Sequence, residues 1–506
     1  MSQAIATPKP YLLTKSRVMS GLQCPKKLWL DVHRPTKQDL HIFHLGNRFG
    51  EFARSFYGVG VDLTGNLDAT SAITATKNAL NDPLVPVIYE AAFLYNDTLV
   101  RVDVLRRLDQ GWEMIEVKSS TSLKDEHIMD ASIQTYIAKS CGLVLEKVQI
   151  AHINNTFVYT GNGQYGSPNE NSPGLLISHD ITQKVLEMLA DVPQWIATFK
   201  PFAILGTSIP EMVMGPHCIQ PHNCQYQGQC ASALPKLAEV PISILPHSGR
   251  ALAKTWALKN IHDLRDLPES ALSNAKHKII QQAHQSGETW ISSEIKSQIQ
   301  NYEWPRYFMD FETAQQGVPL LAGTKAYDAL PFQWSVHRWD KANQTLNLKD
   351  GMGYLQFYDP NMDRNFLTTL LGALGTNGPI FAHHASFEIR ILCELIKRPS
   401  CSDLADAVNA LISRIIDTEV IAKEGFYSPK MMGSHSLKKI VNGIPTSVDY
   451  SSEESLGDGE GAQIAWFKCT DPNVSTTEKE QWQAKLKHYC AQDTLAMYDF
   501  LKYMCS

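Results

Sequence analysis

The chain has 506 residues, which is too many for one compact core and predicts two or three domains. Its apolar fraction of 43% and charged fraction of 19% exclude a wholly disordered, collagen-like or coiled-coil protein. The formal net charge of −6 excludes a protein that coats nucleic acid by bulk electrostatics, so a nucleic-acid partner would have to be held by local patches.

Three sequence signals bear on cellular location. No run of about eighteen apolar residues occurs, so we expect no membrane-spanning helix. The first twenty residues lack the apolar stretch of a secretory signal. Ten cysteines are too few for a disulfide-stapled scaffold of this length. We therefore expect a cytoplasmic protein with no membrane partner.

The first half of the chain predicts a short antiparallel meander followed by a helix. Three strand-like runs lie within residues 84–118, and the breaks between them at Asn96-Asp97 and at 109–111 suit hairpin turns. An acidic segment over 125–140 follows, with apolar residues at helical spacing, and predicts a helix packed against this meander.

The second half predicts a helical connector and then a second α/β pattern. Two short amphipathic stretches within 236–299 indicate the connector. The α/β pattern opens with the strand-like run at 307–313 and closes in a helix over about 477–504. The predicted fold class is therefore α/β with two domains, residues 1–235 and residues 300–506, joined by the connector over 236–299.

The first group of candidate catalytic residues lies on the predicted meander. Glu116 and Lys118 are two residues apart on one strand and so share a face, while Asp103 lies on the neighbouring strand. Two carboxylates can hold Mg²⁺, and a lysine beside them can orient or deprotonate an attacking water. The alternative is cross-strand charge pairing on a solvated face, which is the usual explanation for a bare Glu-x-Lys.

The run from RVDVL through IEVKSS to the helix over 125–140 resembles the PD-(D/E)XK nucleases of the RecB type. This resemblance implies a restriction-endonuclease-like core with Mg²⁺ or Mn²⁺ on Asp103 and Glu116. It also implies that Lys118 and Gln134 act at the attacking water. Glu90 resembles the acidic strand residue that precedes the aspartate in that family.

One departure from the RecB pattern concerns a further metal ligand. Those nucleases often carry a histidine in the first helix, and Gly50 stands at that position here, with Glu51 next to it. Two interpretations stay open. Either Glu51 substitutes for the histidine, or the first site binds metal more weakly than the family does.

Four cysteines form the second group of candidates. Three are clustered with five residues between neighbours, which is a weak zinc pattern even with His217 and His222 available. Three clustered thiolates need a fourth for an all-cysteine iron–sulfur site. The N-terminal Cys-Pro-Lys-Lys segment with the later cysteine cluster resembles the iron–sulfur RecB-like nucleases, and this resemblance implies a [4Fe–4S] cluster on Cys24, Cys218, Cys224 and Cys230. The alternative is four unrelated thiols, and we expect the other six cysteines, Cys490 among them, to be core or surface residues.

The N-terminal segment over 11–54 is locally basic. Eight lysines and arginines stand against three acids, namely Lys15, Arg17, Lys26, Lys27, Arg34, Lys37, Arg48 and Arg54 against Asp31, Asp39 and Glu51. Such a segment suits a surface that follows nucleic-acid phosphates. A solvated helix face explains it equally well.

The third group of candidates is acidic. Asp310 and Glu312 share one face of a predicted strand, Asp493 lies on the last predicted helix, and Glu388 lies between them in sequence. Convergent carboxylates repel one another unless metal ions neutralise them, and a two-metal arrangement suits phosphodiester hydrolysis. These residues resemble the DEDD exonucleases of the DnaQ type, which have an RNase H-like fold. Glu388 stands where that family usually has aspartate, which bears on the second metal.

Two residues are candidates for the general base of this site. Tyr489 lies four positions before Asp493, and His488 lies five positions before Asp493. On an ideal helix Tyr489 lies about 40° from Asp493 and His488 about 140° from it, which favours Tyr489. Asp417 resembles an aspartate that follows the second motif of the fold, as support for the site.

The order of the two regions resembles a bacterial family in which an iron–sulfur RecB-like domain precedes a DEDD exonuclease-like domain. The sequence therefore predicts a metal-dependent nuclease with two active sites that acts on DNA with single-stranded or free ends. Two alternatives remain: one domain is a nucleic-acid-binding module for the other, or the substrate is RNA.

Overall fold

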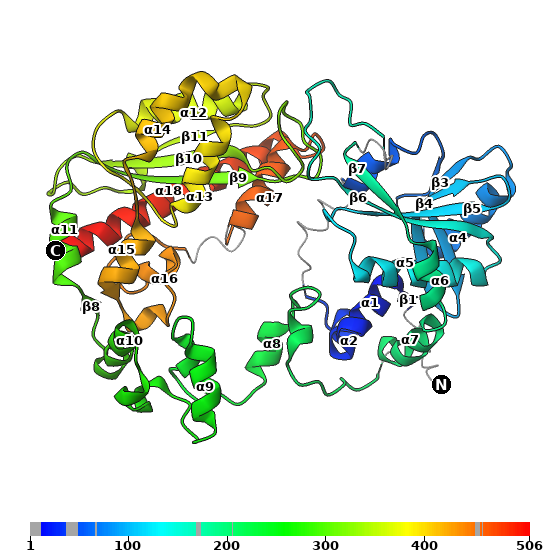
Figure 1. The fold of residues 1–506 in the computed structure, drawn as a ribbon, viewed down its shortest axis with the longest axis horizontal. Helices are drawn as coiled ribbons and strands as arrows, with labels where there is room; N and C mark the ends of the chain where they lie inside the picture. The colour runs from blue at the N-terminus through cyan, green and yellow to red at the C-terminus, as the bar shows by residue number, and fades with distance from the viewer. Residues whose placement is uncertain are drawn as a thin grey trace, which may run out of the picture. The chain divides into compact units, whose positions relative to one another are not determined.

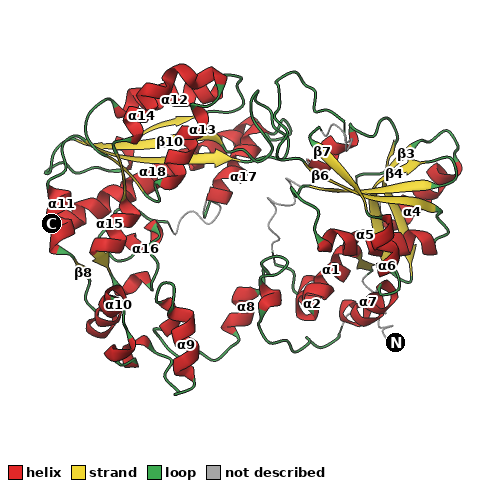
Figure 2. Cartoon of the chain, viewed as in Figure 1, coloured by secondary structure: helices red, strands yellow, loops and turns green. Residues whose placement is uncertain are grey.

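A computed structural model describes residues 12–36, 49–65, 68–167, 174–204, 206–450, 456–457 and 459–506. The chain divides into two compact units, and each contains both helices and sheets, which confirms the predicted α/β class (Figures 1 and 2). The first unit comprises Met1–Pro235 with Gln316–Asp328, and the second comprises Lys236–Gln315 with Ala329–Ser506. Within the described ranges, no helix is long and apolar enough to cross a membrane.

The first unit is built on a seven-stranded sheet of order β2-β3-β4-β5-β6-β7, with β1 paired to β4. Its strands are β1 (Leu13–Thr14), β2 (Val61–Asp62), β3 (Val87–Tyr95), β4 (Thr98–Arg107), β5 (Trp112–Lys118), β6 (Leu145–Ile153) and β7 (Leu176–Asp180). Strands β3, β4 and β5 form the predicted antiparallel meander. The β3–β4 turn is made by Asn96 and Asp97, which both have positive φ, as a tight hairpin requires.

Helix α5 (Asp125–Ser140) has the predicted bounds and carries β5 over to the parallel strand β6. Its side chains at Ile133 and Ile137 are fully buried in the main core of the unit. The other helices of the unit are α1 (Lys15–Gln23), α2 (Pro25–His33), α4 (Ala69–Asn81), α6 (Thr182–Met188), α7 (Val192–Phe199) and α8 (Gln227–Ser232).

A segment from late in the chain completes the first unit. Residues 316–328 follow the first strand of the second unit but pack in a small core with Phe49 and Ile153, to which they contribute Ala326. The Tyr327 hydroxyl donates a hydrogen bond to the backbone carbonyl of Ser119. The sequence assigns this segment to the domain over 300–506. The structure differs because the apolar side chains of the segment find their partners at long range, which local periodicity does not encode.

The second unit contains a five-stranded sheet of order β11-β10-β9-β12-β13. Strands β9, β10 and β11 are antiparallel, while β12 and β13 run parallel to β9. The bounds are β9 (Arg306–Ala314), β10 (Leu330–Trp339), β11 (Met352–Leu355), β12 (Ile380–Ala382) and β13 (Ile415–Asp417). A two-stranded sheet joins β8 (Trp290–Ile291) to β14 (Phe426–Tyr427).

The alternation of side chains along β9 decides where its acidic residues point. Met309 and Phe311 pack in the core that includes helices α12 (Met362–Leu374), α13 (Ser386–Leu395) and α14 (Ala405–Ile412). Phe308 packs in the other core, with the last helix α18 (Thr476–Cys505). Asp310 and Glu312 share the parity of Phe308, so they lie on the side of the sheet that α18 covers.

The predicted connector is part of the second unit. Its helices α9 (Gly249–Ala257), α10 (Ala275–Ser286) and α11 (Ser293–Gln300) lie within residues that cluster with that unit. Leu264, Ile280 and Ile299 are buried in the same core as α18. These apolar residues pack against the second unit and do not form a free spacer. The remaining helices of the unit are α15 (Thr418–Gly425), α16 (Leu437–Val441) and α17 (Gly459–Thr470).

Candidate active sites

Strand pairing in the first unit brings Asp103 opposite Glu116. The antiparallel β4–β5 pairing ends at Val104 and Ile115, and Asp103 and Glu116 are the next residues along the two strands. Oδ2 of Asp103 accepts a hydrogen bond of 2.8 Å from the backbone N–H of Val117. Burial, together with the charge of Glu116, raises the pKa of Asp103 to about 7. The half-buried carboxylate of Asp103 and the buried one of Glu116 therefore form a pair, as two ligands of one cation would.

Glu116 is the centre of a hydrogen-bonded network that contains the other two predicted residues. Its side chain is 2% exposed. The Nζ of Lys118 lies 2.7 Å from its Oε1, and the Nε2 of Gln134 donates to its Oε2 at 2.7 Å. The structure thus brings Asp103, Glu116, Lys118 and Gln134 together.

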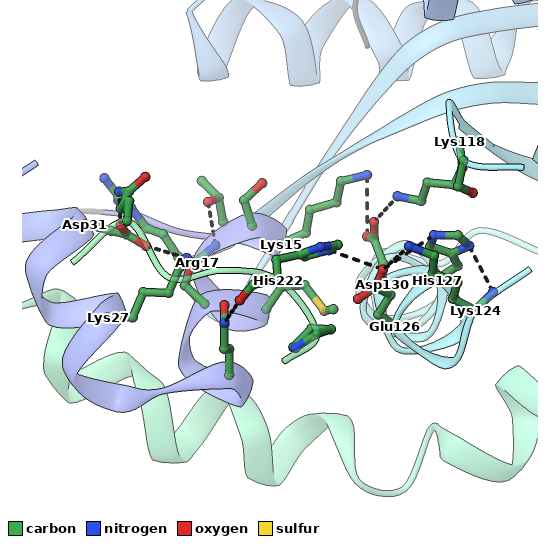
Figure 3. Close-up of a pocket in the computed structure, with 18 of the residues that line it drawn as sticks. Lys15, Arg17, Lys27, Asp31, Lys118, Lys124, Glu126, His127, Asp130 and His222 are labelled. Carbon is green, nitrogen blue, oxygen red and sulfur yellow. Dashed lines mark hydrogen bonds and ion pairs between the residues drawn. The ribbon is translucent and has the colours of Figure 1, made fainter. Parts of the chain in front are cut away.

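The sequence analysis does not assign two members of this network, Lys15 and Asp130, to the site. The Nζ of Lys15 lies 2.6 Å from Oε1 of Glu116 and 3.5 Å from Oδ1 of Asp130. Asp130 also accepts hydrogen bonds from Lys118 and, at 3.0 Å, from Gln134. Figure 3 shows Lys15 and Lys118 directing their amino groups at the same Asp130 carboxylate.

The electrostatics of the network favour its charged form. Burial alone would raise the pKa of Asp130, but the ammonium groups of Lys118 and Lys15 hold it well below its usual range. Burial would likewise lower the pKa of Lys15, yet Asp130 and Glu116 raise it above its usual value. Asp130 precedes Gln134 by one helical turn, so helical spacing is a signal that would find it. No local pattern relates Lys15 to Glu116.

Two cavities open on this network and share Lys118 and Ser119 in their walls. The smaller, about 500 Å³, is lined by Glu90, Asp103 and Glu116 together with Gly50 and Glu51. The larger, about 740 Å³, is lined by basic and polar side chains of α1, α2, the start of α5 and the loop at 221–225, as Figure 3 shows: Lys15, Arg17, Lys27, Lys124, His127 and His222 among others. The carboxylates are therefore reachable from solvent.

The helix position where the RecB-like family often has histidine faces the smaller cavity. Gly50 and Glu51 both line it, and a Cβ added to Gly50 would meet no atom within 4 Å. Glu90 lines it from β3 with a φ of 58°, a strained conformation for a residue other than glycine. Burial raises the pKa of the Glu90 carboxyl, whose Oε1 lies 3.5 Å from Nη2 of Arg54.

All four predicted cluster cysteines line one small cavity of the first unit: Cys24, Cys218, Cys224 and Cys230. Cys24 joins α1 to α2, and the N–H of Cys224 donates to the carbonyl of Cys218 at 2.8 Å. The side-chain amide of Gln23 donates to the carbonyls of His217 and His222 at 3.0 and 2.7 Å. Residues near the start of the unit and residues near position 220 are thus fastened together around the thiols.

The spacing of these thiols bears on the metal that they would hold. Among the described residues, no three of the four sulfur atoms all lie within 4.8 Å of one another. Four sulfurs on one zinc ion, at about 2.3 Å each, would be closer than this. His217 lines the cavity, whereas the Nε2 of His222 lies 3.2 Å from Oε1 of Glu126.

Three charged residues of the basic N-terminal segment lie outside the described residues: Lys37, Asp39 and Arg48.

The acidic residues of the second unit converge beneath α18. Ligand atoms of Asp310, Glu312 and Cys490 all lie within 4.8 Å of one another. Burial and the charges of Asp493, Glu312 and Glu388 raise the pKa of Asp310 well above its usual value. Cys490, which the sequence assigns to core or surface, is buried within this group. Its Sγ lies 3.6 Å from Oδ2 of Asp310.

Asp493 has a partner that the sequence does not indicate. The hydroxyl of Tyr450 donates a hydrogen bond of 2.6 Å to its Oδ1. Burial, with the charge of Asp493, raises the pKa of Tyr450 well above its usual value, so this phenol stays a hydrogen-bond donor. The Nζ of Lys438 lies 5.0 Å from the ring centre of Tyr450 and 5.2 Å from that of Tyr489. A cation thus borders the acidic cluster across two aromatic rings.

Glu388 lies on the first turn of α13, just after the end of β12. It is 3% exposed, and its Oε2 has no hydrogen-bond partner among the described residues. Burial raises the pKa of this carboxyl to about 8. Asp417 accepts hydrogen bonds from the backbone N–H groups of His384 and Ala385 at 3.1 and 3.0 Å. It therefore supports the start of α13.

The two candidate bases point in different directions. Tyr489 is 4% exposed. It lies close enough to Tyr450, the partner of Asp493, for a negative charge on its phenol to raise the pKa of Tyr450. The Nε2 of His488 lies 3.0 Å from Nε2 of Gln492 and faces a separate cavity of about 320 Å³, lined in part by Trp334 and Lys487. The geometry thus places Tyr489 on the side of the carboxylates.

Comparison with known proteins gives limited information about this chain. A family model described as a domain of unknown function, DUF2779, matches residues 307–436. No match is found among curated proteins. A solved structure titled "Crystal structure of SSO0001" is 12% identical with a TM-score of 0.19, and the match covers 41% of this chain and 91% of that one. A similarity of this size is too low to identify a fold or a function.

Proposed function

We propose that the chain is a metal-dependent nuclease with two distinct active sites, which hydrolyses phosphodiester bonds of DNA at single-stranded or free ends. One observation carries the proposal: each unit gathers buried and half-buried carboxylates from separate elements at one point. Asp103 and Glu116 meet in the first unit, and Asp310, Glu312 and Asp493 in the second. Such groupings are costly to bury unless they bind a cation or work as an acid–base pair.

In the first unit we assign a PD-(D/E)XK site. Asp103 and Glu116 offer the oxygen donors that Mg²⁺ or Mn²⁺ prefers, so the residues fit such an ion. A divalent cation there would stabilise negative charge on the phosphate that is attacked. Lys118, held by Glu116 and Asp130, and Gln134, held by the same two carboxylates, are placed to orient the attacking water.

In the second unit we assign an RNase H-like site of the DEDD type that trims 3′ ends. Asp310, Glu312 and Asp493 are the metal-binding carboxylates, Glu388 completes the set, and Tyr489 serves as the base. The oxygen-rich donor set fits Mg²⁺ or Mn²⁺. Support for this site comes from the mixed five-stranded sheet, whose central strand β9 carries Asp310 and Glu312 against α18.

For the four cysteines we infer a structural [4Fe–4S] cluster. Support comes from the cavity that all four cysteines line. The cluster would fasten α1 and α2 to the region around residue 220, where Gln23 already bonds to two backbone carbonyls. Anaerobic purification followed by a visible spectrum tests this, and a colourless protein with one zinc per chain would contradict it.

A specific observation favours a second candidate function, in which the second unit binds the strand that the first unit cuts. One oxygen of Glu388 has no hydrogen-bond partner among the described residues, and burial raises the pKa of this carboxyl to about 8, which favours the protonated form near neutral pH when no cation is bound. A site that fails to recruit a metal through Glu388 would retain only the affinity of its surface for nucleic acid.

The decisive experiment follows degradation of single-stranded DNA labelled at its 5′ or 3′ end, with Mn²⁺ or Mg²⁺. The proteins compared are the unaltered chain, Lys118→Ala and Asp310→Ala, with Lys147→Ala and Asp406→Ala as matched controls outside the two sites. We expect each site variant to remove a different set of products and the controls to remove none.

The possible outcomes separate the two functions. If only one site variant alters the products, the other unit is a binding module. If the unaltered chain degrades labelled RNA and leaves DNA intact, the substrate is RNA, and the two assigned active sites are retained. If neither polymer is degraded with either ion, the nuclease proposal is wrong.

A further inference from the structure

The buried thiol of Cys490 lies inside the carboxylate cluster of the second unit. Its sulfur and carboxylate oxygens of Asp310 and Glu312 all lie within 4.8 Å of one another. The Sγ also points at Asp310 itself, 3.6 Å from Oδ2 and 3.8 Å from the backbone carbonyl. Protein ligands bind a transition metal at about 2.0–2.2 Å through oxygen and about 2.3 Å through sulfur, so three donors this close can share one ion.

A separate observation points to a ligand at the same place. Glu388 lies in the first turn of α13, which follows β12, the parallel neighbour of β9, and its charge acts on Asp310. One of its oxygens is buried with no hydrogen-bond partner among the described residues. Leaving a buried acceptor unsatisfied costs free energy, and a cation at Asp310 would supply the missing interaction.

We propose that Cys490 is a metal ligand, so that the second site is a mixed carboxylate–thiolate centre selective for transition metals over Mg²⁺. The inference rests on the proposed function, because it adds a ligand and a metal preference to the second nuclease site. Thiolate sulfur favours ions such as Zn²⁺, Co²⁺ or Fe²⁺, whereas Mg²⁺ takes oxygen ligands. The thiol releases its proton to solvent when sulfur binds the ion, so no oxidant or reductant takes part.

The position of Cys490 on α18 explains why the thiol belongs to the site. It precedes Asp493 by three residues and follows Tyr489 directly, so one turn of the helix presents a thiol and a carboxylate to the same face. A buried cysteine is ordinarily a small apolar residue. Here its sulfur lies 3.6 Å from Oδ2 of Asp310.

Cadmium tests the proposal because it is a soft ion whose bond to thiolate sulfur absorbs in the ultraviolet. The full chain, stripped of divalent cations and kept reduced, is titrated with Cd²⁺ alongside Cys490→Ser and the matched control Cys469→Ser. The four clustered cysteines contribute equally to all three proteins, so the difference spectrum isolates Cys490. We expect Cys490→Ser to lose one thiolate–cadmium band and about 10- to 100-fold in affinity at that site, and Cys469→Ser to lose neither.

Two further variants keep the test decisive if Cys490→Ser folds poorly. Asp310→Asn retains the thiol but removes a partner ligand, so we expect weaker Cd²⁺ binding with the cysteine band still present at saturation. Cys490→Asp gives an all-oxygen site, for which we expect tighter Mg²⁺ binding relative to Cd²⁺. Identical cadmium bands and affinities in the unaltered chain, Cys490→Ser and Asp310→Asn would overturn the proposal.

The readouts separate this inference from the nuclease function. Cadmium binding through Cys490 in a chain that degrades neither DNA nor RNA would support the metal centre and refute the nuclease. The opposite result is that degradation depends on Asp310 while the cadmium band is the same with and without Cys490. This result would support the nuclease and refute the mixed centre.

Discussion

The two candidate sites both gather buried and half-buried carboxylates, but the contacts of these carboxylates differ in kind. In the first unit the ammonium groups of Lys15 and Lys118 lie 2.6 and 2.7 Å from Glu116 and also pair with Asp130. In the second unit Asp310 and Asp493 accept hydrogen bonds from neutral donors, the thiol of Cys490 and the hydroxyl of Tyr450.

The difference separates a site whose carboxylates pair with ammonium groups from a site in which carboxylate repulsion raises a pKa. Opposite charges let Glu116 and Asp130 stay buried as carboxylates. In the second unit, burial and the repulsion of Asp493 and Glu312 raise the pKa of Asp310. We therefore expect the second unit to depend more strongly on pH and on bound metal than the first.

The largest expected effect is the pH dependence that Glu388 gives to the metal-free second unit. The folded-state pKa of about 8 is above the ordinary value of 4.5, so between these values the folded chain holds a proton that the unfolded chain has lost. The free energy of unfolding should therefore fall as the pH rises from 4.5 to 8, by up to about 1.4 kcal/mol per pH unit. Glu388→Gln should flatten this slope.

Hydrogen exchange of peptides from β9 and β12, measured from pH 5 to 8 after correction for intrinsic rates, follows this unit alone. Glu394→Gln on the same helix is the matched control and should keep the slope of the unaltered chain. An unchanged slope in Glu388→Gln would refute the charge-based explanation.

The next largest effect concerns the lysines of the first site. Lys15→Met removes one of the cations that Glu116 and Asp130 share, and it should cost about 3 kcal/mol in the metal-free first unit. A divalent ion supplies the missing charge, so saturating Mn²⁺ should restore most of the loss. Urea denaturation with and without Mn²⁺ measures both effects, and Lys147→Met serves as the surface control. Failure of Mn²⁺ to stabilise the variant would argue against a metal at Glu116.

A substitution at Gly50 should bring the first site closer to the RecB pattern. Gly50→His places an imidazole on the wall of the cavity that Asp103 and Glu116 line, in a position where a Cβ meets no atom. An added ligand should tighten Mn²⁺ binding on the order of tenfold, about 1.4 kcal/mol. Calorimetric titration of Gly50→His against Gly50→Ala, in a background of Asp310→Asn, checks this. Equal affinities would mean that the helix over 49–54 does not serve the metal.

The smallest effect tests whether the first site needs residues from late in the chain. Tyr327→Phe removes the hydrogen bond to the carbonyl of Ser119, next to Lys118, and should cost about 1 kcal/mol. It should also speed hydrogen exchange in the residues after β5. Tyr358→Phe is the control, and equal exchange in both variants would show that the segment at 316–328 does not steady the first site.

The chain dictates local relations by itself. The meander, helix α5 and the long last helix follow from apolar periodicity and turn residues, and the structure places them at the predicted residues. Glu116 with Lys118, and Asp310 with Glu312, are two apart on strands and must share a face. Tyr489 lies one helical turn before Asp493, and this spacing places it nearer the carboxylates than His488.

Only the tertiary structure decides which distant residues join these local groups. Lys15 meets Glu116 across 101 positions, and Tyr450 meets Asp493 across 43. Cys490 becomes a site residue because α18 packs against β9, and residues 316–328 join the first unit because their apolar side chains fit a core there. Backbone geometry fixes contacts within a turn or a strand, whereas these contacts depend on how whole elements pack to remove apolar surface from water.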